Sequence, residues 1–134
     1  MGGKTNNLIF KIMAFNGTEG SFISLADGAE MTETFRNTFL GNGRTRKAIF
    51  FGKDKLMELL NQTDCVGIRC YFGGVVTTVD PKSSVVDYSL VLVGAKANEN
   101  DMVGEMDKIL DDGVPCPAQC GMANPLNPAT VTTL

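Results

Sequence analysis

The sequence predicts an α+β fold, with a small antiparallel sheet, two or three helices packed on one of its faces, and an irregular proline-rich C-terminal tail. Segments 65–73 and 85–97 are rich in valine, isoleucine and aromatic residues, which is typical of strands. Two other segments place apolar residues at helical spacing. Four of the five prolines follow residue 113, where they prevent a regular helix or a central strand.

The composition is that of a globular protein, with 43% hydrophobic and 20% charged residues among 134. This length fits one domain with an ordinary hydrophobic core. The net charge of −3 gives no general attraction to nucleic acid or to anionic membranes. No apolar run is long enough for a transmembrane helix or continuous enough for a signal peptide. We therefore expect a cytoplasmic protein with neither nucleic-acid nor membrane partners.

The N-terminal third predicts a strand, a turn and a helix. Residues 8–15, LIFKIMAF, are apolar with weak alternation, which favours a buried strand, and Asn16-Gly17 favours a tight turn. Ser24 and Asp27 resemble a capping box at the start of a helix of about 14 residues, which glycines after residue 40 terminate. The apolar stripe of this helix comprises Met31, Phe35 and Phe39.

The middle of the chain predicts a second helix and a hairpin. Residues 48–51 favour a short strand or a buried turn, and a helix over about 53–62 is expected to bury its leucines. Segments 65–73 and 85–97 predict an antiparallel hairpin, with residues 75–79 extending its first strand and Asp80-Pro81 marking a turn. The leucines expected to be buried are Leu56, Leu59 and Leu60.

Segment 98–110, NENDMVGEMDKIL, fits a short helix that Gly113 terminates. Its apolar residues are Met102, Val103, Met106, Ile109 and Leu110. We therefore expect a single α+β domain over residues 1–113 and a C-terminal extension containing proline and cysteine over residues 114–134.

Three motifs resemble, in the same order, those of a family of small uncharacterised bacterial proteins: AEMTETFR at 29–36, FFGKDKLMELLNQTDCVGIRCYFG at 50–73 and VPCPAQCG at 114–121. The resemblance covers about residues 22–121 and implies a bacterial source and a shared fold, but no activity. The chain departs from the family pattern in its longer connection between the hairpin strands, rich in valine and threonine, and in Cys70. The longer connection is therefore a place where a property particular to this chain would lie.

The chain contains no histidine. This removes Ser-His and Cys-His nucleophile pairs, the commonest general base and every His-ligated metal site, so we favour a non-enzymatic protein without a cofactor. A four-cysteine zinc site is disfavoured because the spacings are C-x4-C and C-x3-C. Cys65 and Cys70 would also point to opposite faces of a strand. We interpret both as small, buried apolar residues.

Three interpretations of Cys116 and Cys120 remain open: two thiols packed in a structured tail, a local disulfide, or redox or metal chemistry. Both residues lie in the proline-bearing segment, without core-like neighbours. A reducing cytosol disfavours a disulfide there, whereas export would favour one.

Charged residues gather in two clusters of opposite sign. The basic cluster places five of the twelve cations within 12 positions: Arg44, Arg46, Lys47, Lys53 and Lys55. The acidic cluster places six carboxylates within 14 positions: Glu99, Asp101, Glu105, Asp107, Asp111 and Asp112. Either these clusters are solvated faces, or the basic cluster of one copy meets the acidic cluster of the next in a head-to-tail contact. The neighbouring Phe50 and Phe51 are expected in the core rather than exposed for stacking on bases.

The sequence therefore favours a protein-interaction or self-assembling structural protein, with homo-oligomers as the expected assembly. A redox or metal-binding protein using Cys116 and Cys120 is the first alternative. A small-ligand module with Arg69 in its pocket is the second, and its competing interpretation is an ion pair between Arg69 and a neighbouring acid at the sheet rim.

Overall fold

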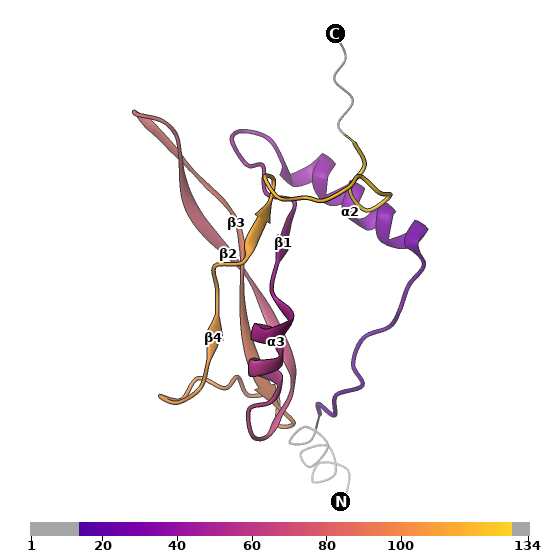
Figure 1. Cartoon of the computed structure of the whole chain (residues 1–134), viewed down its shortest axis with the longest axis vertical. Helices are drawn as coiled ribbons and strands as arrows, with labels where there is room; N and C mark the ends of the chain where they lie inside the picture. The colour runs from indigo at the N-terminus through magenta and orange to yellow at the C-terminus, as the bar shows by residue number, and fades with distance from the viewer. Residues whose placement is uncertain (1–13, 130–134) are drawn as a thin grey trace, which may run out of the picture. The chain divides into compact units, whose positions relative to one another are not determined.

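The structure is a computed structural model that describes residues 14–129, with only the backbone of Val79. Its elements in chain order are α2 (Leu25–Phe39), β1 (Ala48–Phe50), α3 (Lys53–Leu60), β2 (Cys65–Asp80), β3 (Ser83–Lys96), β4 (Ile109–Leu110) and β5 (Val114–Cys116) (Figure 1). The two helices and the small antiparallel sheets of the described chain confirm the predicted α+β class.

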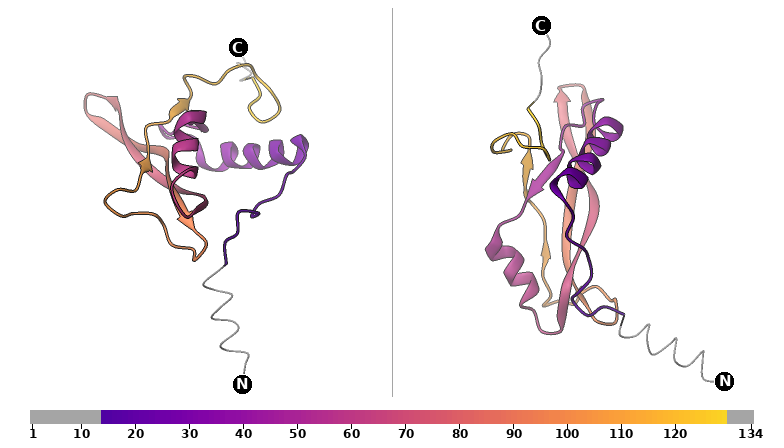
Figure 2. Two further views of the ribbon diagram at one scale, coloured as in Figure 1. Left: turned by 60° about the horizontal axis from the view of Figure 1, so that its bottom comes forward. Right: turned by 90° about the vertical axis from the view of Figure 1, so that its right-hand side faces the viewer.

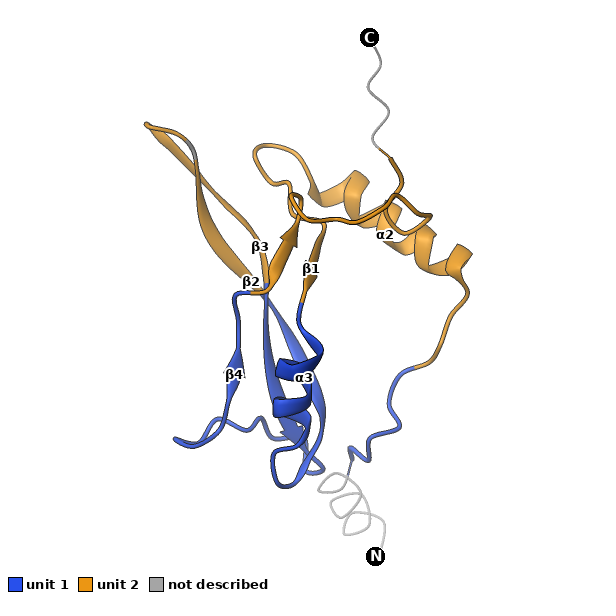
Figure 3. Cartoon of the chain, in the orientation of Figure 1, with its two compact units in different colours: residues 1–20, 51–72, 90–112 blue, residues 21–50, 73–89, 113–134 orange. Residues whose placement is uncertain are grey.

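Two compact units divide the chain (Figure 3). Unit 1 comprises Met1–Gly20, Phe51–Phe72 and Leu90–Asp112, and unit 2 comprises Ser21–Phe50, Gly73–Ser89 and Gly113–Leu134. Two of the five boundaries fall inside β2 and β3. The predicted division at 113/114 lies next to the start of the last segment of unit 2, and independent folding of residues 1–113 stays a prediction.

The hairpin of β2 and β3 is confirmed, including the extension of β2 through residues 75–79. Its turn is held by Asp80, whose carboxylate accepts hydrogen bonds from Lys82 N at 2.8 Å and Ser83 Oγ at 2.7 Å. In the three-stranded sheet the order is β2-β3-β4, so β3 is central and β2 is an edge strand. A two-stranded sheet pairs β1 with β5, with Ala48 opposite Cys116.

The core of unit 1 lies where α3, β3 and β4 meet. Leu59 of α3 and four residues on or after β3 are buried: Leu92, Val93, Ala95 and Met102. Gly94 allows this packing, because a Cβ there would lie only 3.0 Å from the sulfur of Cys65 and 3.1 Å from that of Met102. The prediction that Leu60 is buried is wrong, since this residue ends α3 with its side chain exposed.

Helix α2 begins as predicted at Ser24, whose Oγ accepts a hydrogen bond from Asp27 N at 3.0 Å. Figure 2 shows it as one uninterrupted helix. Phe35 packs against Tyr88 of β3, with ring centroids 5.3 Å apart, and Tyr88 donates its hydroxyl hydrogen bond to Phe39 O at 2.7 Å. Only Gly28 of this helix is buried, and Met31 is 67% exposed, so most of the apolar stripe stays in solvent.

The predicted helix over segment 98–110 is wrong. Asp101 forms a bridge to Ala95, Met102 N donates to Gly94 O at 2.8 Å, and Ile109–Leu110 form β4 on the edge of β3. Pairing with β3 satisfies these backbone groups, so tertiary hydrogen bonding overrides the helical spacing of the apolar residues.

Three further expectations fail or fall outside the structure. Phe50 is 66% exposed rather than in the core, because β1 pairs with the short strand β5. Phe51, which was also expected in the core, is only half-buried. Of the predicted strand 8–15, only Ala14 and Phe15 are described, and neither is in a strand; the rest lies outside the described residues.

Candidate functional site

The outer half of β2, residues 73–80, forms an uncovered strand edge. Among residues 14–129, β2 pairs with β3 alone, so the N–H and C=O groups of its other edge have no partner strand. The sequence GGVVTTV at 73–79 carries no charge and no proline. Val76 is 69% exposed, and Val86 on the neighbouring strand is also exposed. A Cβ at Gly74 would lie 2.6 Å from Val86 Cγ1, so glycine lets the valine lie over the strand.

A loop near the C-terminus is fixed on α2 by polar contacts. The carbonyl oxygen of Leu126 accepts hydrogen bonds from Thr32 Oγ1 at 3.0 Å and from Arg36 Nη1 at 2.8 Å. The side chain of Leu126 lies over Gly28, where a Cβ would come within 3.1 Å of it. Asn124 and Asn127 close the loop with two backbone hydrogen bonds. The sequence does not predict this contact, because no pattern links an isolated leucine to a helix 90 residues away.

A basic cavity of about 660 Å³ lies beside this loop in unit 2. Its cations are Arg36, Arg44 and Lys47, each half-buried, and no aspartate or glutamate lines it. Its other lining residues include Leu40, Pro117, Cys120, Ala123, Asn127 and Pro128. The Oδ1 atom of Asn127 is buried and has no hydrogen-bond donor. The cavity therefore combines unneutralised positive charge with apolar walls.

The remaining predicted charged residues divide between paired and unpaired groups. Among the described residues, the ion pairs are Lys55–Glu58 at 3.2 Å, Lys108–Glu58 at 3.9 Å and Arg69–Asp101. Asp107 forms a hydrogen bond within its own turn, in which its Oδ2 accepts from Gly104 N at 2.9 Å. Besides Asp107, the following described residues of the two clusters have no ion pair: Arg44, Arg46, Lys47, Lys53, Glu99, Glu105, Asp111 and Asp112.

Arg69 is paired with an acid, as its competing interpretation expected. Its guanidinium bonds to the carboxylate of Asp101 and donates to Glu99 O at 3.1 Å, and it lies 5.4 Å from the ring centroid of Phe15. Tyr71 donates its hydroxyl to the second carboxylate oxygen of Asp101. These contacts satisfy the charge of Arg69 inside unit 1.

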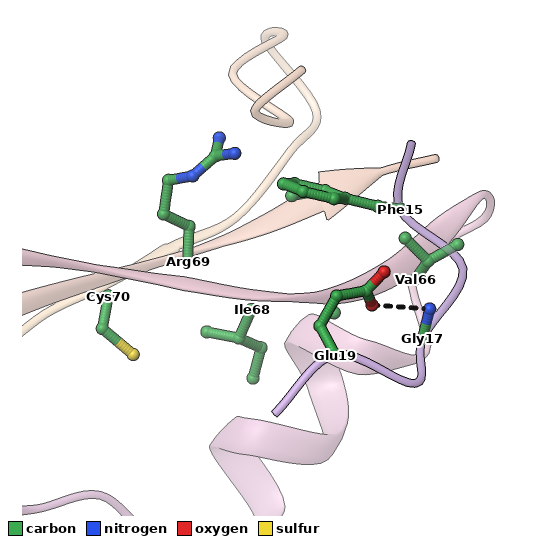
Figure 4. A pocket seen from close by; sticks show the side chains of 9 residues that line it. Phe15, Gly17, Glu19, Val66, Ile68, Arg69 and Cys70 are labelled. Atoms are coloured by element: carbon green, nitrogen blue, oxygen red, sulfur yellow. Dashed lines mark hydrogen bonds between the residues drawn. The ribbon is translucent and has the colours of Figure 1, made fainter. Parts of the chain in front are cut away.

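A cavity of about 400 Å³ borders this part of β2 (Figure 4). Figure 4 shows Arg69 and Phe15 on one side of the strand and Ile68 and Cys70 on the other. Glu19, also in the lining, accepts hydrogen bonds from Asn16 N and Gly17 N, each at 2.9 Å. The charged groups that line this cavity, Arg69 and Glu19, already have hydrogen-bond partners within the chain. A ligand would therefore gain few polar interactions there.

The pKa values of this cluster shift together. The hydrogen bond from Tyr71 lowers the pKa of Asp101, burial opposes this, and the Arg69 guanidinium lowers it further. The same bond raises the pKa of Tyr71, because ionising the phenol would remove a donor from a carboxylate. Tyr71 thus contributes stability that is present below about pH 10 and is lost as pH rises through its raised folded-state pKa.

A spectroscopic titration tests this coupling. In a Tyr88→Phe variant, Tyr71 is the only tyrosine, since the chain has two. We expect its phenol absorbance to titrate above the ordinary value of about 10, and addition of Asp101→Asn to return the midpoint to about 10 or lower. Circular dichroism at each pH checks that the protein stays folded. Equal midpoints with and without Asp101 would contradict the assigned contact.

The cysteines behave in two ways. Cys116 and Cys120 form a disulfide, with Cα atoms 4.8 Å apart, which selects one of the three interpretations left open by the sequence. Cys65 is half-buried and its thiol donates to Gly67 O at 3.2 Å, whereas Cys70 is exposed. The interpretation of Cys70 as a buried apolar residue is therefore wrong, since its side chain on β2 is exposed.

The buried carboxylate of Asp87 was not among the residues predicted to matter. It is 3% exposed, and it accepts hydrogen bonds from the backbone N–H groups of Thr45, Arg46 and Tyr88. An aspartate inside the apolar run VVDYSLVLV is the signal that was available. Its role is structural, since it ties the segment before β1 to β3.

Comparison of the chain with protein-family models, curated proteins and solved structures gave no match. Membership of the bacterial family that the motifs resemble therefore stays a prediction. Over residues 14–129, no helix has the length and apolarity needed to span a membrane. In the same range, no group of three cysteine or carboxylate side chains is arranged to hold a metal ion.

Proposed function

We propose that this chain is a non-enzymatic, self-assembling interaction protein, whose copies associate by pairing residues 73–80 of their β2 strands. The observation that supports this is the uncovered edge, which is uncharged from Gly73 to Val79. Natural edge strands usually carry lysine, proline, a bulge or a covering segment that prevents such pairing. Residues 73–79 carry neither lysine nor proline. The valine- and threonine-rich connection that departs from the family pattern is thus assigned to assembly.

Antiparallel pairing of two identical edges is closed by a two-fold axis, so this contact alone produces a dimer. It joins unpaired backbone N–H and C=O groups of one copy to those of the other. It also brings the exposed Val76 side chains of the two copies close to one another on the new sheet, removing apolar surface from water.

Val76→Lys is the direct test. Two lysines brought close across the two-fold axis repel each other and remove the apolar contact, so we expect the dimer dissociation constant to rise at least roughly tenfold. Size-exclusion chromatography with light scattering, across a dilution series, measures it. Met122→Lys is the matched control, since it introduces the same charge at an exposed apolar residue of unit 2 outside the edge.

Three outcomes are informative. Loss of dimer in Val76→Lys with retention in Met122→Lys supports edge pairing. Equal loss in both variants points to a general charge effect and contradicts pairing through this edge. A wild-type chain that remains monomeric at every concentration removes the proposed function itself.

A further inference from the structure

The basic cavity of unit 2 carries charge that nothing in the described chain neutralises. Arg36, Arg44 and Lys47 are half-buried, and none has a carboxylate within ion-pair distance among residues 14–129. Partial burial weakens the hydration of a cation, so an incoming carboxylate gains more there than at an open surface. Leu126 O also orients Arg36 by accepting its Nη1 hydrogen bond, which leaves the other donors of the guanidinium for a ligand.

The cavity also selects for more than charge. Leu40, Pro117, Ala123 and Pro128 provide apolar walls next to the cations. Cations beside apolar walls fit an acidic peptide segment that carries an apolar residue better than a free inorganic anion.

Such a segment exists in unit 1. The turn 103–106 presents Glu105, which has no ion pair in the described chain, and Met106, which is 92% exposed. The turn is preformed, because Gly104 N donates to Asp107 Oδ2 at 2.9 Å and Asp107 N donates to Gly104 O at 3.0 Å. A preformed turn loses little conformational entropy when it binds.

We propose that the turn 103–106 of one copy binds in the basic cavity of a second copy, with Glu105 bonded to Arg44 and Lys47 and Met106 against the apolar walls. This inference rests on the proposed function that copies associate. It adds a second, different contact, because the turn and the cavity are distinct surfaces of the chain. A contact between distinct surfaces is heterologous and extends into rings or filaments, whereas edge pairing ends at a dimer.

Charge reversal with mixing tests the contact. Glu105→Arg and Arg44→Glu each place like charges together, so each variant alone should assemble no further than the dimer, with the heterologous contact weakened at least roughly tenfold. An equimolar mixture should recover larger assemblies, because each variant cavity then meets a complementary turn. Native mass spectrometry at low salt measures the distribution, and circular dichroism confirms folding.

Two matched controls make the same charge changes elsewhere. Glu30→Arg reverses an exposed acid of α2, and Lys53→Glu reverses an exposed cation of the basic cluster that does not line the cavity. Both should assemble as the wild-type chain does. Assembly beyond the dimer should also weaken as salt is added, since the Glu105 contact is ionic.

The outcomes separate this contact from the proposed function. Recovery in the mixture supports the contact. Charge variants that assemble like wild type, or a folded mixture that fails to recover, overturn it while leaving edge pairing intact. Saturation of the cavity by inorganic phosphate, with assembly unchanged in Glu105→Arg, would show a small-anion site and overturn the contact. A monomeric wild-type chain overturns both proposals.

Discussion

Replacing Asp87 by alanine is expected to destabilise the protein by about 3 kcal/mol. The carboxylate accepts hydrogen bonds from Tyr88 N at 2.8 Å, Thr45 N at 3.0 Å and Arg46 N at 3.3 Å, and from Thr45 Oγ1 at 3.3 Å. Alanine leaves these donors without an acceptor at a position that is 3% exposed in the native chain. Each buried donor left unpaired costs about 1–3 kcal/mol, and partial entry of water reduces the sum.

Urea denaturation followed by circular dichroism measures this loss. Glu33→Ala is the control, since it deletes an exposed carboxylate of unit 2 within α2 and should change the free energy of unfolding by less than about 0.5 kcal/mol. A loss below about 1 kcal/mol for Asp87→Ala would show that the Thr45–Arg46 segment is not held by this carboxylate.

The same residue gives the protein an acid-sensitive contact. Burial favours the neutral acid and raises the pKa of Asp87, but the hydrogen bonds from Thr45, Tyr88 and Arg46 together outweigh it and lower the pKa. A depressed folded-state pKa contributes stability that is fully present above the unfolded value of about 3.9 and is lost as pH falls through the folded value. Asp87→Ala should therefore reduce the dependence of unfolding free energy on pH below about 4.

The sequence predicted the structure correctly where contacts between residues close along the chain determine it. Ser24 supplies a side-chain acceptor to Asp27 N, three residues away, and this contact depends on nothing else in the fold. The turn after Asp80 is equally local, and it fixes where β2 ends and β3 begins. Valine and threonine in residues 75–79 favour strand before that turn.

The failures have a common physical cause, which is competition from distant parts of the chain. Met102 and Ile109 have helical spacing, but an open edge of β3 offers backbone hydrogen bonds that a short isolated helix does not match. Phe50 was expected in the core because it is apolar, but composition does not show which elements pack against a residue. Strand β1 pairs with the short strand β5, and Phe50 stays exposed. The sequence located the residues of the two charge clusters, but it did not show which charges are neutralised within the chain. Arg69 neutralises Asp101, and Tyr71 adds a hydrogen bond to the same carboxylate.

Breaking the Cys116–Cys120 disulfide with Cys120→Ser is expected to lower the free energy of unfolding by about 2 kcal/mol, the chain-entropy value for a ring of about five residues. The native contacts it supports are few. Lys47 N donates to Cys116 O at 2.9 Å, and Gln119 N donates to Pro115 O at 3.2 Å. Reducing agent should destabilise the wild-type chain by the same amount and leave Cys120→Ser unchanged, whereas Cys70→Ser should match the wild type in both conditions. An equal effect of reductant on all three proteins would contradict the assigned bond.

The disulfide also connects redox state to the proposed assembly. The pairing of β1 with β5 covers three residues on each strand, which is too short to be stable without support. Pro117 and Cys120 line the basic cavity directly after β5, so loosening this strand alters the walls against which Met106 is proposed to pack. Reduction should therefore shift larger assemblies towards the dimer, as Glu105→Arg does, without the loss of edge pairing expected for Val76→Lys. Since cytosolic thiols are kept reduced, a chain that stays in the cytoplasm would be held at the dimer, and one that reaches an oxidising compartment would assemble further.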